Sequence, residues 1–173
     1  MYIGSATERG LHRLVDELVS HAIDEAAGGH AGAVDVTLMA DGGVRVADDG
    51  RGIPVEDIET ALTELRAGSF SVVGRCVVNA LSRRVEVEVR RDGFRWTQRH
   101  ERGVPLAPPS RHERTPDTGT TIAFWPDPEI FGAAECSFAA LSDHFRELTA
   151  LDEAPTLTLT LTDERTPRAG RLP

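Results

Sequence analysis

Long apolar runs are missing from this 173-residue sequence, and Met1 to Ser5 contain neither the basic region nor the apolar stretch of a secretion signal. Cysteine is also scarce. Cys76 and Cys136 lie far apart and match no metal-binding or redox spacing, so we interpret them as ordinary buried thiols in a reducing compartment. We therefore expect a cytoplasmic protein without membrane association.

An excess of positive charge is absent as well. The formal net charge of -9 repels polyphosphate backbones, so we expect no direct binding to nucleic acid. Apolar residues make up 40% and charged residues 27% of the chain, which excludes a disordered or fibrous class. The length fits one domain, which we place at residues 1–165, with a flexible tail at 166–173.

Hydrophobic periodicity predicts helices mixed with hairpins. A helix is expected from a Ser5/Glu8 capping box to Gly28, with further helices at 55–67, 72–81 and 137–151. Hairpins are expected where strands flank the turns at 41–43 and 92–93. A polar loop at 102–117 then leads to strands at 120–125 and 156–162. This order lacks regular strand-helix alternation and favours a largely antiparallel sheet with helices on one face.

Asp48 has the clearest chemical signal. Alternation along its strand places it on the face of Val44 and Val46, opposite Arg45, so its carboxylate is expected at a buried position. A buried carboxylate is unfavourable unless donors satisfy it. The glycines within residues 49–54 allow the backbone to turn and approach a ligand closely. Two interpretations stay open here: a capped turn, or a site for an amino group on a flat ring.

A second group of polar side chains lies on the first predicted helix. Glu17, His21 and Asp24 fall within an arc of about 60° beside the apolar stripe, because each helical residue turns by about 100°. A solvated polar face is the usual explanation of this spacing. A metal site or an acid/base cluster is the alternative.

Several short motifs follow one another along the chain. They are MYIGS at 1–5, ERGLH at 8–12, ELVSHAIDEA at 17–26, DGGVRVADDGRGIP at 41–54, VVNALS at 77–82, TGTTIAFWPD at 118–127 and LTDER at 161–165. In this order they resemble the N-terminal ATPase domain of bacterial DNA gyrase B and its topoisomerase IV relative, in the Bergerat-fold (GHKL) family. The resemblance implies an α/β (α+β) two-layer sandwich that binds ATP or ADP.

The resemblance also implies roles for matching residues. Glu17 would polarise the attacking water, Asp48 would recognise the adenine amino group, and Gly52 and Thr120 would complete adenine recognition. The nucleotide-binding set that it implies is His21, Asp24, Val46, Asp48, Gly50, Arg51, Gly52, Ile53, Pro54 and Thr120.

The outer edge of the implied site has matching residues too. Arg51 and Pro54 match residues that line this edge, and Arg51 is expected to pair with Glu25. Arg91 matches an arginine that contacts aminocoumarin inhibitors in gyrase. A flat heterocyclic ligand other than a nucleotide is therefore a further candidate partner.

The sequence departs from the family at the phosphate end. His21 replaces the asparagine that holds magnesium, and imidazole is a poor substitute for oxygen ligands, so we expect His21 to hold magnesium poorly or not at all. The family's lid and its G-G-L-H-G-V-G loop are reduced to residues 69–76, where valines replace glycines. Arg75 offers one positive charge there. From the ends of the sequence we expect neither the N-terminal arm nor the transducer lysine of gyrase.

These departures leave four hypotheses. The first is a degenerate gyrase-B-like domain, a pseudoenzyme, that binds adenine nucleotide with little or no hydrolysis, because phosphoryl transfer depends on positioning and charge stabilisation. The second is an ATPase subunit of a topoisomerase-like assembly that a partner protein, not identified by the sequence, completes. The third is binding of gyrase-directed inhibitors such as aminocoumarins. The fourth is a structural role in which Asp48 is satisfied internally.

Overall fold

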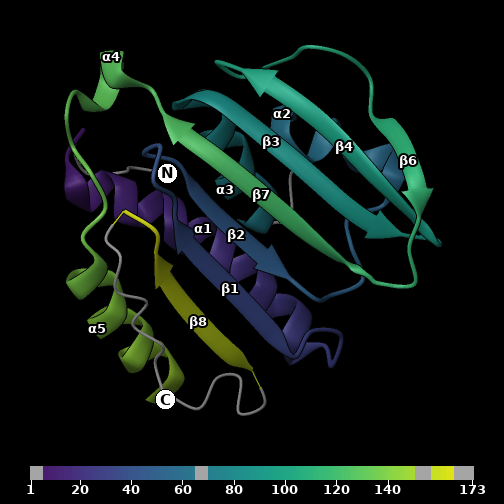
Figure 1. Cartoon of the computed structure of the whole chain (residues 1–173), viewed down its shortest axis with the longest axis horizontal. Helices are drawn as coiled ribbons and strands as arrows, with labels where there is room; N and C mark the ends of the chain where they lie inside the picture. Colours follow the sequence, from purple (N-terminus) through teal and green to yellow (C-terminus); the bar gives the residue numbers. More distant parts are fainter. Residues whose placement is uncertain (1–5, 65–69, 151–156, 166–173) are drawn as a thin grey trace.

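The computed structural model describes residues 6–64, 70–150 and 157–165, which form one mostly antiparallel sheet backed by helices (Figure 1). The strands are β1 (Ala33–Leu38), β2 (Val44–Asp48), β3 (Ser82–Arg91), β4 (Phe94–Glu101), β5 (Val104–Pro105), β6 (Ser110–Arg114), β7 (Gly119–Pro126) and β8 (Thr158–Asp163). Their order in the eight-stranded sheet is β5-β4-β3-β7-β2-β1-β8, and β6 also pairs with β4. Among the described strands, only β8 pairs in parallel, with β1.

The helices are α1 (Glu8–Ala27), the 3-10 helix η1 (Val55–Asp57), α2 (Thr60–Thr63), α3 (Phe70–Ala80), α4 (Pro128–Phe131) and α5 (Phe138–Ala150). In Figure 1, α1, α2 and α3 lie behind the sheet, and α5 lies beside β8. The apolar stripe of α1 is buried against the sheet and includes Leu11, Leu14, Val15, Leu18, Val19 and Ala22. The predicted two-layer sandwich with a largely antiparallel sheet is confirmed.

Both predicted hairpins form. Val34 faces Asp48 across β1 and β2, and Arg91 faces Phe94 across β3 and β4. The second hairpin turns through Asp92 and Gly93, whose φ angles are 55° and 79°. Positive φ at both central residues matches the right-handed twist of the strands and explains the Asp-Gly pair. The hairpins place β2 and β3 on either side of β7.

The continuous helix expected at 55–67 is wrong over its described part. The chain forms η1, then the single turn α2, and at Glu64 the backbone is extended. The bond from the Ile58 amide to the Val55 carbonyl spans three residues, as in a 3-10 turn. The buried side chains Ile58, Ala61 and Leu62 have a spacing that fits such a turn as well as an α-helix. Residues 65–69 lie outside the described residues.

Three smaller expectations also differ. The N-cap of α1 is Thr7, which makes no side-chain cap bond, and Ser5 lies outside the described residues. The segment at 102–117 is not only loop, because it contains β5 and β6. Cys136 is buried, but Cys76 is partly exposed and lies 3.3 Å from the Glu64 carbonyl oxygen. The predicted tail at 166–173 lies outside the described residues.

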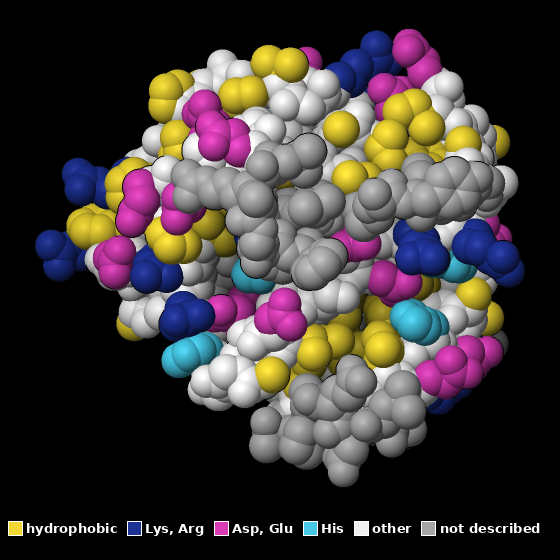
Figure 2. Space-filling model, turned by 180° about the vertical axis from the view of Figure 1, so that it is seen from behind, with side chains coloured by type: hydrophobic (Ala, Val, Ile, Leu, Met, Phe, Trp, Pro, Cys, Tyr) yellow, Lys and Arg dark blue, Asp and Glu magenta, His cyan; other side chains and the backbone are white. Residues whose placement is uncertain are grey.

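The surface of the helical side carries charges of both signs. Figure 2 shows basic side chains scattered among acidic and hydrophobic ones over the described residues of this side. No helix among residues 6–64, 70–150 and 157–165 is long and apolar enough to cross a membrane.

Candidate functional site

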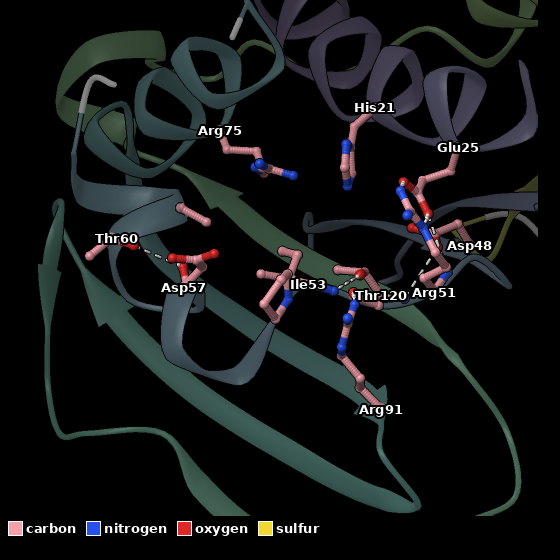
Figure 3. Close-up of a pocket in the computed structure, with 13 residues that line it drawn as sticks. His21, Glu25, Asp48, Arg51, Ile53, Asp57, Thr60, Arg75, Arg91 and Thr120 are labelled. Atoms are coloured by element: carbon pink, nitrogen blue, oxygen red, sulfur yellow. Dashed lines mark hydrogen bonds and ion pairs between the residues drawn. The ribbon is translucent and has the colours of Figure 1, made fainter. Parts of the chain in front are cut away.

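A cavity of about 230 Å³ opens between α1, α3 and the segment that follows β2 (Figure 3). The predicted site residues that line it are His21, Glu25, Asp48, Arg51, Gly52, Ile53, Pro54, Arg91 and Thr120. Residues that the sequence did not point to also line it: Asp57, Thr60 and Ala61. Arg75 completes the lining. The cavity therefore gathers residues that are far apart in the sequence.

Asp48 lies at the end of β2 on the buried face, as predicted, with 8% of its surface exposed. Its Oδ1 accepts hydrogen bonds from the Gly50 amide at 2.9 Å and the Thr120 amide at 3.2 Å. Burial raises the pKa of Asp48, while these two bonds oppose that rise. Both amides bond to Oδ1, which leaves Oδ2 available to a donor on a ligand.

The floor of the cavity joins two separate segments. Gly52, at φ +78°, turns the chain so that the Ile53 amide donates to Thr120 Oγ1 at 3.2 Å. Gly119 precedes Thr120 and has φ +136°. A Cβ added to Gly119 would lie 2.0 Å from the Asp48 carbonyl oxygen, so only glycine allows this approach. This contact fixes Thr120 beside the Asp48 carboxylate.

Two arginines, Arg51 and Arg91, line the outer edge of the cavity. Arg51 forms a bidentate pair with Glu25, with Nη2 to Oε1 at 2.8 Å and Nε to Oε2 at 3.1 Å, as expected from the sequence. The hydrogen bonds from Arg51 lower the pKa of Glu25 to about 2. Arg91 Nη1 donates to the Gly52 carbonyl at 2.6 Å.

His21 and Arg75 lie at the inner end. They come from α1 and α3, and Figure 3 shows both pointing into the space between these helices and Ile53. Burial, assisted by the charge of Arg75, lowers the pKa of His21 to about 4, so its imidazole is neutral at pH 7. Arg75 is only 5% exposed, and its Nε and Nη1 have no hydrogen-bond partner among the described residues.

Four other predicted residues do not line the cavity. Glu17 packs against α3, since a Cβ on Gly74 would lie 2.3 Å from Glu17 Oε2. Asp24 is exposed on α1, and Val46 belongs to the hydrophobic core. Gly50 supplies its amide to Asp48.

The metal or acid/base cluster considered for the helix does not form. Of Glu17, His21 and Asp24, the cavity takes in only His21. Within the part of the chain that the structure describes, no group of three or more His, Cys, Asp or Glu side chains could hold a metal ion.

Together, the sheet backed by helices and the buried aspartate beside a glycine turn define an ATP-binding domain of the GHKL type. The family model described as histidine kinase-, DNA gyrase B-, and HSP90-like ATPase matches residues 6–130, and the chain belongs to this family.

Comparison with individual proteins narrows the relationship to gyrase B. The chain is 50% identical over 185 residues to the novobiocin-sensitive DNA gyrase B of Streptomyces niveus, and equally so to DNA gyrase B of Streptomyces coelicolor. It is 44% identical over 184 residues to DNA gyrase B of Mycobacterium tuberculosis. Each match covers 95% of this chain but only 27% of the relative, so the chain spans about a quarter of these proteins. It is a gyrase-B-like ATP-binding domain.

The length of the match also bears on the shortened lid. The match to the novobiocin-sensitive Streptomyces niveus protein runs over 185 positions, whereas 95% of the 173 residues is about 164. About twenty positions of that relative therefore have no counterpart in this chain. The shortened segment at 69–76 stays a prediction, which a gap of this total size would accommodate.

Proposed function

We propose that this domain binds an adenine nucleotide in the Asp48 cavity and hydrolyses it little or not at all. The purine edge would donate its amino group to Asp48 Oδ2, beside the hydroxyl of Thr120. Membership of an ATP-binding family and the assembly of these groups around one cavity support this assignment.

The position of Glu17 is the observation that carries the proposal of low turnover. Glu17 matches the family's water-polarising glutamate, but its carboxylate packs against Gly74 and does not line the cavity. A general base must come within hydrogen-bond reach of the attacking water. The inner end of the cavity instead holds a neutral imidazole and a guanidinium. Neither group replaces a base aimed at a γ-phosphate.

Phosphate release from ATP tests this proposal. We expect no release above background from the chain, and calorimetry to detect binding of adenosine or ATP. Glu17→Gln is the matched control, because it removes the candidate base and keeps the side-chain size. Release that Glu17→Gln abolishes contradicts the low-turnover proposal. Release that begins only on addition of a partner protein supports a completed ATPase instead.

Binding of a gyrase-directed inhibitor is the second candidate. Arg51, Pro54 and Arg91 line the cavity together, and the Arg51 guanidinium is already held by Glu25. Two relatives from Streptomyces niveus, 50% and 49% identical, are named as novobiocin-sensitive and novobiocin-resistant forms of DNA gyrase B. Titration with novobiocin and with a non-hydrolysable ATP analogue separates the candidates. Tight novobiocin binding without nucleotide binding favours the inhibitor site.

A further inference from the structure

Arg75 differs from the other arginines of the cavity because it has no partner among the described residues. Arg51 is held by Glu25, and Arg91 donates to the Gly52 carbonyl and lies near Asp92. No hydrogen bond or ion pair reaches Arg75 from the described residues, and its Nε and Nη1 are buried without an acceptor. The guanidinium retains its charge, as arginine does in proteins. A buried cation without a partner is unfavourable unless an anionic group of a ligand pairs with it.

The surroundings of Arg75 favour an anion. The lining residue beside it, His21, has a neutral imidazole at pH 7, so it does not compete for an anionic group. The charges of Asp48 and Glu25 reach Arg75 over a distance without contacting it. Each of these carboxylates is already engaged, Asp48 with backbone amides and Glu25 with Arg51. Asp57 is a third carboxylate of the lining on the side of Arg75, and no hydrogen bond or ion pair joins it to Arg75 (Figure 3). Among the described residues that line the cavity, Arg75 is therefore the arginine without a partner.

The same residues do not fit the magnesium ion that the family implies. Magnesium prefers oxygen ligands in octahedral geometry, and this end presents the His21 nitrogen and the Arg75 cation with a single carboxylate, Asp57. No cluster of three metal-ligating side chains exists within the described ranges. A divalent cation placed here would be repelled by Arg75.

We propose that Arg75 binds the anionic group of the ligand directly, a phosphate monoester on a purine nucleoside, without a divalent cation. Asp48 recognises the ring at one end of the cavity, and the Arg75 fork takes the phosphate oxygens at the other. The cavity, about 230 Å³, lies below the roughly 300–1,000 Å³ of pockets for drug-sized ligands. A single guanidinium fork takes the oxygens of one phosphate group, which favours a mononucleotide. The inference rests on the proposed nucleotide site and specifies its ligand.

Calorimetry with adenosine, AMP and ATP, each in EDTA and in magnesium, tests the inference. We expect AMP to bind the natural chain about tenfold or more tightly than adenosine, the typical effect of a hydrogen bond to a charged group. Methionine has a side chain of similar length without the charge. The Arg75→Met variant should therefore bind AMP only as tightly as it binds adenosine. Arg75→Lys should restore part of the difference. Magnesium should leave the affinities for adenosine and AMP unchanged.

The outcomes separate the two proposals. Failure of both adenosine and AMP to bind contradicts the proposed function. Equal affinity for both, discrimination that survives Arg75→Met, or tighter binding with magnesium contradicts only the role of Arg75.

Thermal unfolding of the ligand-free protein gives a second measurement. An anion-binding Arg75 is a buried charge without a partner, so Arg75→Met should raise the melting temperature. A purely structural arginine would give a lower melting temperature on replacement, and that result would overturn the assignment.

Discussion

Gly119 lies so close to Asp48 that a Cβ on Gly119 would stand 2.0 Å from the Asp48 carbonyl oxygen. Gly119→Ala should therefore separate β7 from the end of β2 and displace the Thr120 amide from Asp48. We expect a loss of about 3 kcal/mol or more of unfolding free energy, from steric overlap and from φ +136°. Urea denaturation measures it.

Gly42→Ala is the matched control. Gly42 also has a positive φ, +85°, but a Cβ there would meet no atom of the described residues within 4 Å. Only backbone strain of about 1–2 kcal/mol is expected. Equal losses for the two variants would show that the contact with Asp48 is unimportant.

Protonation of His21 should destabilise the fold. Burial and the charge of Arg75 lower its folded-state pKa to about 4, against an ordinary value of 6.5, while Glu25 opposes this and Arg51 adds to it. The unfolded chain therefore binds more protons between these values, and stability contributed by neutral His21 is lost as pH falls from 6.5 through 4.

NMR titration of the His21 imidazole checks this value directly. Arg75→Met should raise the pKa of His21, because it removes a nearby positive charge. His21→Asn should flatten the dependence of unfolding free energy on pH between 6.5 and 4. A midpoint near the ordinary 6.5 in the folded protein would contradict the buried position of the ring.

Glu25 should show the response of a carboxylate held by a cation, in a lower pH range than His21. Its folded-state pKa of about 2 lies below the ordinary 4.5, so the stability it contributes is present above 4.5 and is lost as pH falls towards 2. Arg51→Gln should move the pKa of Glu25 back towards its ordinary value, measured by NMR of the carboxyl carbon. Arg146→Gln, which removes an exposed ion pair on α5, should leave Glu25 unchanged. A Glu25 pKa unaffected by Arg51→Gln would disprove the pairing in solution.

Asp48→Asn tests ring recognition without removing the local hydrogen bonds. The amide oxygen can still accept from the Gly50 and Thr120 amides, so the melting temperature should change little. The other position becomes an NH₂ donor and faces the donor of the ligand. We expect adenosine affinity to fall about tenfold or more, and calorimetry measures it. Unchanged affinity would favour an Asp48 that is satisfied internally.

The sequence predicted the parts of the fold that rest on strong apolar patterns. Alternation at Val44, Val46 and Asp48 was enough to place a carboxylate on the buried face, and the turn glycines marked both hairpins. It could not predict β6, because Ser110–Arg114 is exposed throughout and has no apolar alternation. The helix at 55–67 was overestimated because a spacing of three residues fits a 3-10 turn equally well.

The residues of the candidate site were predictable from the sequence at the end with Asp48 and Thr120. They were less predictable at the inner end, where His21 and Arg75 lie. Motifs around Asp48 and Thr120 pointed to residues that line one cavity. The placement of Glu17 against Gly74 depends on how α1 packs on α3, which no local pattern encodes. The one available signal for Arg75 was a charge inside an otherwise apolar helix, and the structure adds that this charge is buried without a partner among the described residues.

The parallel strand β8 affects how the chain can assemble. It pairs Thr158 with Ala33, residues 125 positions apart, at the edge of the sheet beside β1. Pairing over such separations is slow. The chain must lose the conformational entropy of closing a large loop before any stabilising contact forms. During synthesis on the ribosome, β1 therefore has an uncovered edge until the segment 158–163 has emerged. The last described strand to be translated therefore protects the first described strand from pairing with other chains.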